Sequence, residues 1–158
     1  MAKTGAFFKE FFKEKKTVGS VVPSWRFLQR KMVSRIDFSS AECIVELGPG
    51  EGCISRRIVD MMGSETDLVL FEMNTGFVNR FLQFDNPRIH TINDSAAYIG
   101  KYLEELKLPK CDAIISSLPL TNFPKQLRED IVNEAIRNLK PGGVYMQYQY
   151  STTALALL

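Results

Sequence analysis

The stretch CIVELGPGEG at residues 43–52 decides how this chain folds, because a short apolar run gives way within it to a cluster of glycines. A short apolar run that ends in turn residues is typical of a buried strand. Glycines directly after a strand let the backbone approach a bound molecule closely, and a helix that follows them presents free N–H groups. We therefore predict a strand at residues 43–47 and a helix at residues 52–62, closed by Gly63.

The same alternation of strand and helix continues on both sides of this stretch. Further strands are predicted at residues 67–71, 88–92, 112–116 and 144–150, and further helices at residues 24–35, 75–84, 96–106 and 124–139. Strands that alternate with helices indicate an α/β fold, in which helices cover both faces of a parallel sheet. The 158 residues match the length of one domain, so we expect residues 1–158 to form a single domain.

The composition excludes several classes of protein. Hydrophobic residues make up 45% and charged residues 24% of the chain, which is typical of a globular protein and not of a disordered one. Three scattered cysteines and one histidine argue against a disulfide framework, a metal site and a Ser-His-Asp relay. No apolar run reaches the roughly 18 residues that span a bilayer, and no secretory signal is recognisable, so we expect a cytoplasmic protein.

The N-terminus differs from the rest of the chain in charge. Residues 1–31 carry eight basic and two acidic residues, although the net charge of the whole chain is only +2. The tetrad Phe-Phe-Lys-Glu occurs at 7–10 and again at 11–14, which predicts an amphipathic helix within residues 1–17 that docks on an anionic membrane surface. Alternatively, its four phenylalanines cover the sheet. The expected membrane-binding residues are Phe7, Phe8, Lys9, Phe11, Phe12, Lys13 and Lys16.

Glycines and acidic residues follow the predicted strands, at the edge of the sheet where ligands of such folds bind. The first strand is followed by glycines at 48, 50 and 52, the second by Glu72 and the third by Asp94. Glu72 can accept both hydroxyl hydrogens of a ribose, and Asp94 can accept from an adenine amino group. This set indicates a nucleoside-containing cofactor, the alternative being turn glycines beside two surface acids.

The spacing of the glycines separates the possible cofactors. A nicotinamide site has a glycine at the sixth position of G-x-G-x-x-G, which is Cys53 here, and the Lys-Ser/Thr pair of a Walker loop is absent. The pattern E-x-G-x-G-x-G at residues 46–52 resembles the first motif of class I S-adenosylmethionine-dependent methyltransferases. The resemblance implies that Glu46 lies near the ammonium group of the cofactor. The residues expected to bind S-adenosylmethionine, or its product S-adenosylhomocysteine, are Ser20, Ser24, Glu46, Gly48, Pro49, Gly50, Gly52, Glu72, Met73, Asp94, Ser95 and Ser116.

The fourth strand is followed by Ser-Ser-Leu-Pro-Leu at residues 116–120. Amino-methylating members of the superfamily often have Asn/Asp-Pro-Pro-Tyr or Asn-Leu-Pro-Tyr here, with an aromatic residue that stacks on a base. Ser117 replaces the amide or acid, and Leu120 replaces the aromatic residue. A base would lose stacking worth roughly 1–3 kcal/mol, whereas a small aliphatic amine would lose nothing.

Taken together, the chain is similar to bacterial phospholipid N-methyltransferases of the peripherally bound type. The similarity rests on an aromatic and basic N-terminus, V-G-S-V-x-P-S at 18–24, E-L-G-P-G-x-G at 46–52, S-x-L-P-L at 116–120 and Q-Y-x-Y at 147–150. It implies stepwise methylation of phosphatidylethanolamine toward phosphatidylcholine at the inner face of the cell membrane, without nucleic acid or metal.

The resemblance also implies an architecture. We expect a Rossmann-like sheet of five parallel strands in the order 3-2-1-4-5, in which the usual last two strands are missing. The fifth strand is then an open edge, so the protein is expected to be a monomer or an edge-strand dimer. Residues 18–40 are expected to form a helix and loop that cover the cofactor.

Three residues are candidates for receiving the amine that is methylated. They are the backbone carbonyls of Ser117 and Leu118 and the hydroxyl of Tyr148. Tyr148 has an alternative role as a packed strand aromatic, because alternation places it on one face with Met146 and Tyr150.

Three rival functions stay open at this point. An rRNA adenine N6-dimethyltransferase shares the architecture, but it normally has an aromatic residue in the fourth motif and an added helical domain. A methyltransferase for a small amine or a protein is the second. The third is a membrane-docked module that binds S-adenosylmethionine without turnover.

Overall fold

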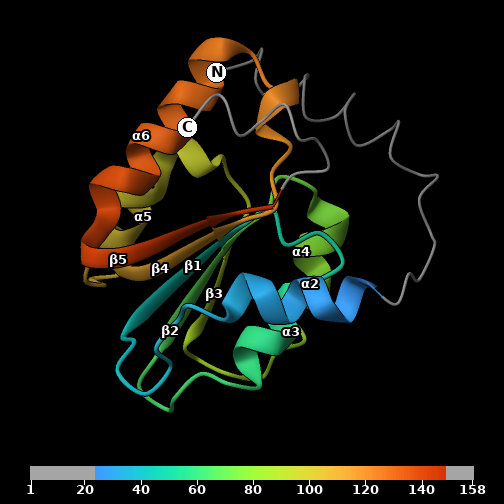
Figure 1. Cartoon of the computed structure of the whole chain (residues 1–158), viewed down its shortest axis with the longest axis vertical. Coiled ribbons are helices and arrows are strands. Elements are labelled where there is room, and N and C mark those ends of the chain that lie inside the picture. Colours follow the sequence, from blue (N-terminus) through green and yellow to red (C-terminus); the bar gives the residue numbers. More distant parts are fainter. Residues whose placement is uncertain (1–23, 149–158) are drawn as a thin grey trace.

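A computed structural model describes residues 24–148, which fold around one five-stranded sheet (Figure 1). The strands are β1 (Cys43–Leu47), β2 (Asp67–Phe71), β3 (Ile89–Ile92), β4 (Cys111–Ser116) and β5 (Leu139–Gln147). Their order is β3-β2-β1-β4-β5, and every neighbouring pair is parallel. The predicted fold class and the predicted strand order are therefore confirmed.

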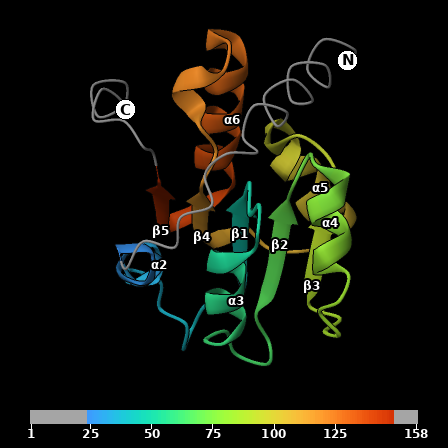
Figure 2. The same cartoon turned by 90° about the vertical axis from the view of Figure 1, so that its right-hand side faces the viewer.

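Helices cover both faces of the sheet (Figures 1 and 2). They are α2 (Ser24–Val33), α3 (Cys53–Val59), α4 (Thr75–Phe81), α5 (Ile99–Glu105) and α6 (Lys125–Asn138), with 3-10 turns η1 (Ala96–Tyr98) and η2 (Leu120–Asn122). Side chains alternate along a strand, so β1 contributes to two cores. Val45 and Leu47 pack with residues of α5 and α6, whereas Ile44 packs with residues of α2, α3 and α4.

The register brings the carboxyl ends of four strands to one edge of the sheet. Leu47, the last residue of β1, pairs with Phe71 of β2 and with Ser116 of β4, and Phe71 pairs with Ile92 of β3. The loops at residues 48–52, 72–74, 93–95 and 117–119 therefore leave the sheet side by side. This edge is where the sequence predicts the cofactor.

The predicted boundaries agree best for the central strands and least for β5. β1 and β2 have the bounds that the sequence predicts, and every residue of both strands is buried. Residues 140–143 were predicted to end the helix before a strand at 144, but Leu139 is already extended and pairs with Cys111. The strand then bulges and resumes pairing at Val144, because the register against β4 outweighs the local turn preference of Pro-Gly-Gly.

Some of the predicted residues fall outside this region. The docking segment at residues 1–17, Ser20 and Tyr150 lie outside the described residues, and Ser24 is the first residue of α2. Within residues 24–148, no helix is long and apolar enough to cross a membrane. In the same range, histidine, cysteine and acidic side chains form no group of three or more that could hold a metal ion.

Candidate functional site

The three glycines after β1 have left-handed backbone conformations but different surroundings. Their φ angles are 70° at Gly48, 56° at Gly50 and 75° at Gly52, values that residues other than glycine rarely adopt. A Cβ on Gly48 would lie 2.6 Å from Leu118 Cδ2, and one on Gly52 would lie 2.6 Å from Phe81 Cε1. A Cβ on Gly50 would meet nothing within 4 Å. Packing therefore requires the outer two glycines, whereas Gly50 faces open space in which a ligand can approach the backbone.

Glu46 is buried at the end of β1 on the face that α3 covers. Its side chain is fully inaccessible to solvent, and Ser55 Oγ of α3 donates a hydrogen bond of 2.6 Å to its Oε2 atom. Its Oε1 atom has no hydrogen-bond partner among the described residues. Burial raises the pKa of Glu46 from 4.5 to about 8, although the Ser55 hydrogen bond lowers it and the charge of Glu72 raises it further. An unpartnered buried oxygen of this kind is costly unless a ligand supplies the missing hydrogen.

Glu72 connects the end of β2 to the glycine loop. Its Oε2 atom accepts the Gly50 N–H at 3.0 Å, and its Oε1 atom accepts the Asn74 N–H at 2.8 Å. Burial raises the pKa of Glu72 above its ordinary value, and these backbone hydrogen bonds oppose the rise. Each carboxylate oxygen has two lone pairs, so both oxygens can also accept from hydroxyl groups.

Asp94 follows β3 and is fixed by residues on both sides of it. Its Oδ1 atom accepts the Ser95 N–H at 2.7 Å, and its Oδ2 atom accepts the Tyr102 hydroxyl hydrogen at 2.8 Å. The hydrogen bond to Asp94 raises the pKa of Tyr102 to about 12. Ser95 Oγ in turn accepts the Ala97 N–H and caps η1. Tyr102 was not among the predicted site residues, and its only signal in the sequence is its position two helical turns beyond Asp94.

The remaining predicted cofactor residues lie next to these acids. Pro49 closes the glycine loop, because its carbonyl accepts the Gly52 N–H at 2.9 Å. Met73 follows Glu72 and packs against the core on the α5 and α6 side. Ser116 is fully buried at the end of β4, next to Leu47.

The segment after β4 is held from two directions. The Ser117 N–H donates to the Leu47 carbonyl at 2.9 Å. The Leu118 carbonyl accepts both the Leu120 N–H and the side-chain amide of Gln147, each at 2.9 Å. A carbonyl oxygen has two lone pairs, so the amine-binding role predicted for Leu118 requires one of these hydrogen bonds to break. Gln147 was not among the predicted site residues.

At the end of β5, side chains alternate between the two faces of the sheet as predicted, up to Tyr148. Met146 and Tyr148 pack against the core on the α2 and α3 side, whereas Tyr145 packs on the opposite side. The Tyr148 N–H donates to the Ser116 carbonyl at 2.8 Å, which extends the pairing of β5 with β4 by one residue. The partly buried Tyr148 therefore lies beside the candidate site, and its role in receiving an amine stays a prediction.

The chemistry of this edge suits a cation that carries hydroxyl groups. Glu46 lies at the end of β1, and the loops contribute Glu51, Glu72 and Asp94. Residues 48–52, 72–74, 93–95 and 117–119 contain no lysine or arginine. A phosphate group would find no positive partner in these loops and would lie among acidic side chains. An ammonium or sulfonium with a ribose matches both the unpartnered oxygen of Glu46 and the open space at Gly50.

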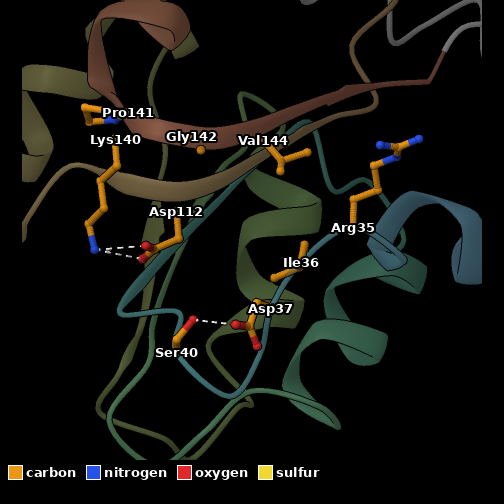
Figure 3. A pocket seen from close by; sticks show the side chains of 10 residues that line it. Arg35, Ile36, Asp37, Ser40, Asp112, Lys140, Pro141, Gly142 and Val144 are labelled. Carbon is orange, nitrogen blue, oxygen red and sulfur yellow. Dashed lines mark hydrogen bonds and ion pairs between the residues drawn. The ribbon is translucent and has the colours of Figure 1, made fainter.

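A groove at the opposite end of the sheet is built differently (Figure 3). The residues that line it include Arg35, Asp37, Asp112 and Lys140. Asp112 forms an ion pair of 2.9 Å with Lys140 Nζ, and Asp37 accepts a hydrogen bond of 2.8 Å from Ser40 Oγ. The acids of this groove are satisfied by the protein itself, so the groove is not our candidate site.

Comparisons with known proteins agree with this reading of the fold. No model of a known protein family matches the chain. An ornithine lipid N-methyltransferase from Singulisphaera acidiphila is 28% identical over 145 residues, which cover 89% of this chain and 74% of that protein.

Two solved structures are similar in fold at low sequence identity. A precorrin-6y C5,15-methyltransferase from Geobacter metallireducens has a TM-score of 0.64 and 15% identity, covering 90% of this chain and 69% of that one. An S-adenosylmethionine-dependent O-methyltransferase from Thermotoga maritima has a TM-score of 0.61 and 15% identity, covering 92% and 51%. The chain therefore has the α/β Rossmann-like methyltransferase fold.

Proposed function

We propose that this chain is an S-adenosylmethionine-dependent N-methyltransferase whose acceptor is the amine of a membrane lipid. The observation that carries the proposal is the buried Glu46 carboxyl at the end of β1, whose Oε1 atom has no partner among the described residues. It is followed in the chain by the glycine loop, where Gly50 leaves open space. The fold and the similarity to a protein named as a lipid N-methyltransferase support it.

Each of the three acidic residues binds a different part of the cofactor. Glu46 binds the ammonium group, Glu72 accepts hydrogen bonds from the ribose hydroxyls, and Asp94 accepts one from the adenine amino group. Gly50 lets the ligand lie against the backbone, because its missing side chain would have occupied that space. Bound S-adenosylmethionine supplies a methyl group that its sulfonium has already activated.

The acceptor side favours an aliphatic amine over a nucleobase. Leu120 stands where many base-modifying relatives have an aromatic residue, and it is only 1% exposed, within the core against α5 and α6. It therefore offers no face on which a base could stack. This observation weakens the rRNA adenine dimethyltransferase alternative.

The chain's own task toward the amine is to hold it unprotonated and in line with the methyl group. An aliphatic ammonium has a pKa of about 10.4, so it must lose a proton before it reacts. We propose that the backbone carbonyl of Ser117 and the hydroxyl group of Tyr148 hold the amine. Orientation of this kind can lower a barrier by roughly 7–11 kcal/mol.

Two lipid headgroups are candidates for the acceptor. The motifs at residues 18–24, 116–120 and 147–150 resemble those of phosphatidylethanolamine methyltransferases. The similar protein from Singulisphaera acidiphila is named for ornithine lipid instead. We propose phosphatidylethanolamine as the acceptor, with ornithine lipid as the alternative, since both headgroups present a primary amine.

A transfer assay separates these functions. The protein is incubated with S-adenosylmethionine that carries a labelled methyl group and with vesicles containing phosphatidylethanolamine, ornithine lipid or neither, and a fourth sample contains ribosomal RNA. We expect label in phosphatidylethanolamine. Label in ornithine lipid alone would change the acceptor, and label in RNA would overturn the lipid proposal. Cofactor and vesicle binding without transfer to any sample would favour a module without turnover.

Membrane docking is the second part of the proposal and rests on sequence. The basic and aromatic residues at 7–16 would place the protein at the inner face of the cell membrane, where each cation contributes about 1 kcal/mol near anionic lipid. Replacing Phe8 and Phe11 together by glutamate should release the protein from sedimented anionic vesicles and leave its cofactor affinity unchanged. Unchanged sedimentation would refute docking by this segment.

A further inference from the structure

Within residues 24–148, the buried carboxyl of Glu46 accepts one hydrogen bond, and its donor is Ser55. Both side chains are fully inaccessible to solvent, and Ser55 lies in the first turn of α3, directly beyond the glycine loop. The 2.6 Å hydrogen bond to Oε2 fixes the plane of the carboxyl group. It also leaves Oε1 as the atom without a partner.

We propose that Ser55 is a positioning residue that holds Glu46 for the ammonium group of the cofactor, and that binding of this cation releases the proton of Glu46 to solvent. The inference rests on the proposed function, because it takes S-adenosylmethionine as the ligand. It goes beyond the proposed function in two respects, a role for Ser55 and the release of a proton on cofactor binding.

Among residues 24–148, no basic side chain acts on Glu46 to keep its carboxyl group charged before the ligand arrives. Two polar groups face it: the neutral hydroxyl of Ser55 from α3, and the acidic carboxyl of Glu72 from the end of β2. Its register partners on β2 and β4 are Leu70 and Ile115, both apolar and buried. A carboxyl group in such a site is neutral unless a cation pairs with it.

The proton balance follows from this starting state. Before binding, the Glu46 carboxyl carries its proton and the ligand carries an ammonium cation. On binding, the O–H bond breaks, the proton goes to solvent, and the carboxylate that remains pairs with the ammonium while Oε2 keeps the hydrogen bond from Ser55. Because a proton is released, affinity should increase with pH until the free Glu46 ionises by itself, which is consistent with its pKa of about 8.

Calorimetry with the wild-type protein tests the proton directly. S-adenosylhomocysteine is titrated at about pH 6.5, where its ammonium is charged, in two buffers that differ in their enthalpy of protonation. The difference in heat gives the number of protons released, and we expect about one per ligand. The control ligand is 5′-methylthioadenosine, which lacks the amino acid portion and should bind without releasing a proton.

The outcomes distinguish this inference from the proposed function. Binding of S-adenosylhomocysteine without proton release would overturn the inference and leave the cofactor assignment in place. Equal proton release by both ligands would overturn it as well, because the proton would then not come from the ammonium contact. If neither ligand bound at any pH, the proposed function itself would fail.

A matched pair of variants tests the role of Ser55. In Ser55→Ala, affinity for S-adenosylhomocysteine should decrease by about tenfold, while affinity for 5′-methylthioadenosine stays unchanged. The control is Thr66→Val, which removes another buried hydroxyl, whose hydrogen bond of 2.7 Å to the Ala41 carbonyl lies at the opposite end of the sheet. It should leave both affinities unchanged. A decrease of both affinities by the same factor in Ser55→Ala would mean that Ser55 only supports the fold.

Discussion

The two ends of the sheet shift the pKa values of their acidic residues in opposite directions. At the amino end, Asp112 accepts the N–H groups of Glu42 and Cys43 and pairs with Lys140. Burial alone would raise its pKa, but these contacts outweigh burial and lower it. At the carboxyl end, burial raises the pKa values of Glu46 and Glu72.

The difference separates residues that stabilise the fold from residues that the fold keeps for a ligand. A carboxyl group with a lowered pKa contributes stability as an anion, whereas one with a raised pKa resists ionisation and lowers stability when it ionises. Groups with perturbed pKa values cluster at functional sites for this reason. The ion pair and hydrogen bonds of Asp112 therefore stabilise the amino end, whereas the carboxyl end is where we propose that the cofactor binds.

The largest expected effect comes from filling the open space at the carboxyl end. Gly50→Val should weaken binding of S-adenosylhomocysteine by about a hundredfold, because the side chain occupies the space the ligand needs. The matched control is Gly142→Val at the amino end, where φ is 81° and a Cβ also meets nothing within 4 Å. Backbone strain should cost roughly 1–2 kcal/mol of stability in both variants. Equal loss of affinity in both, measured by calorimetry, would contradict the assignment of the loop.

The amino end can be broken at Asp112. Asp112→Ala leaves two backbone N–H groups without their acceptor and removes one partner of Lys140, so the free energy of unfolding should decrease by about 2–3 kcal/mol. Denaturant titration measures this loss. Affinity for S-adenosylhomocysteine should stay within a factor of about two, because the change is at the far end of the sheet. A large loss of affinity would show that the two ends are coupled.

Glu46 should respond to pH in the direction opposite to a stabilising acid. Its pKa is 4.5 in the unfolded chain and about 8 in the fold, so its neutral form stabilises the fold most below pH 4.5, and this stability is lost as pH rises toward 8. In Glu46→Gln this slope should disappear. Relative to wild type, the variant should become progressively more stable between pH 5 and pH 8. Parallel stability curves for the two proteins, from denaturant titration at each pH, would refute the raised pKa.

The smallest effect is expected at Tyr102. Tyr102→Phe removes the hydroxyl that donates to Asp94 Oδ2, which should cost about 0.5–1 kcal/mol of stability and reduce cofactor affinity by about threefold. At the amino end, Ser40→Ala removes a comparable hydrogen bond, to Asp37, and should leave affinity unchanged. Thermal unfolding and ligand titration of both variants would measure the two effects. Tighter cofactor binding by Tyr102→Phe would mean that Tyr102 competes with the adenine for Asp94.

Much of this contrast could be predicted from sequence, and the reasons for the exceptions are physical. The strands β1 and β2 are short and mostly apolar, so their position and the acids at their carboxyl ends were predictable. The raised pKa of Glu46 was not predictable, because it depends on how deeply the carboxyl group is buried below α3. Nor was the role of Gln147, which lies 29 residues from the Leu118 carbonyl that it binds. Contacts of this kind arise from the register of the sheet and leave no local pattern.

Binding of the cofactor at the carboxyl end of the sheet can be tested residue by residue. The most direct measurement is an NMR titration of the isotope-labelled protein with S-adenosylhomocysteine, which follows every backbone amide at once. We predict the largest shifts at residues 48–52, 72–74 and 93–95, and unchanged signals at Glu42, Asp112 and Lys140. Shifts confined to the amino end, or no shifts at saturating ligand, would contradict the account.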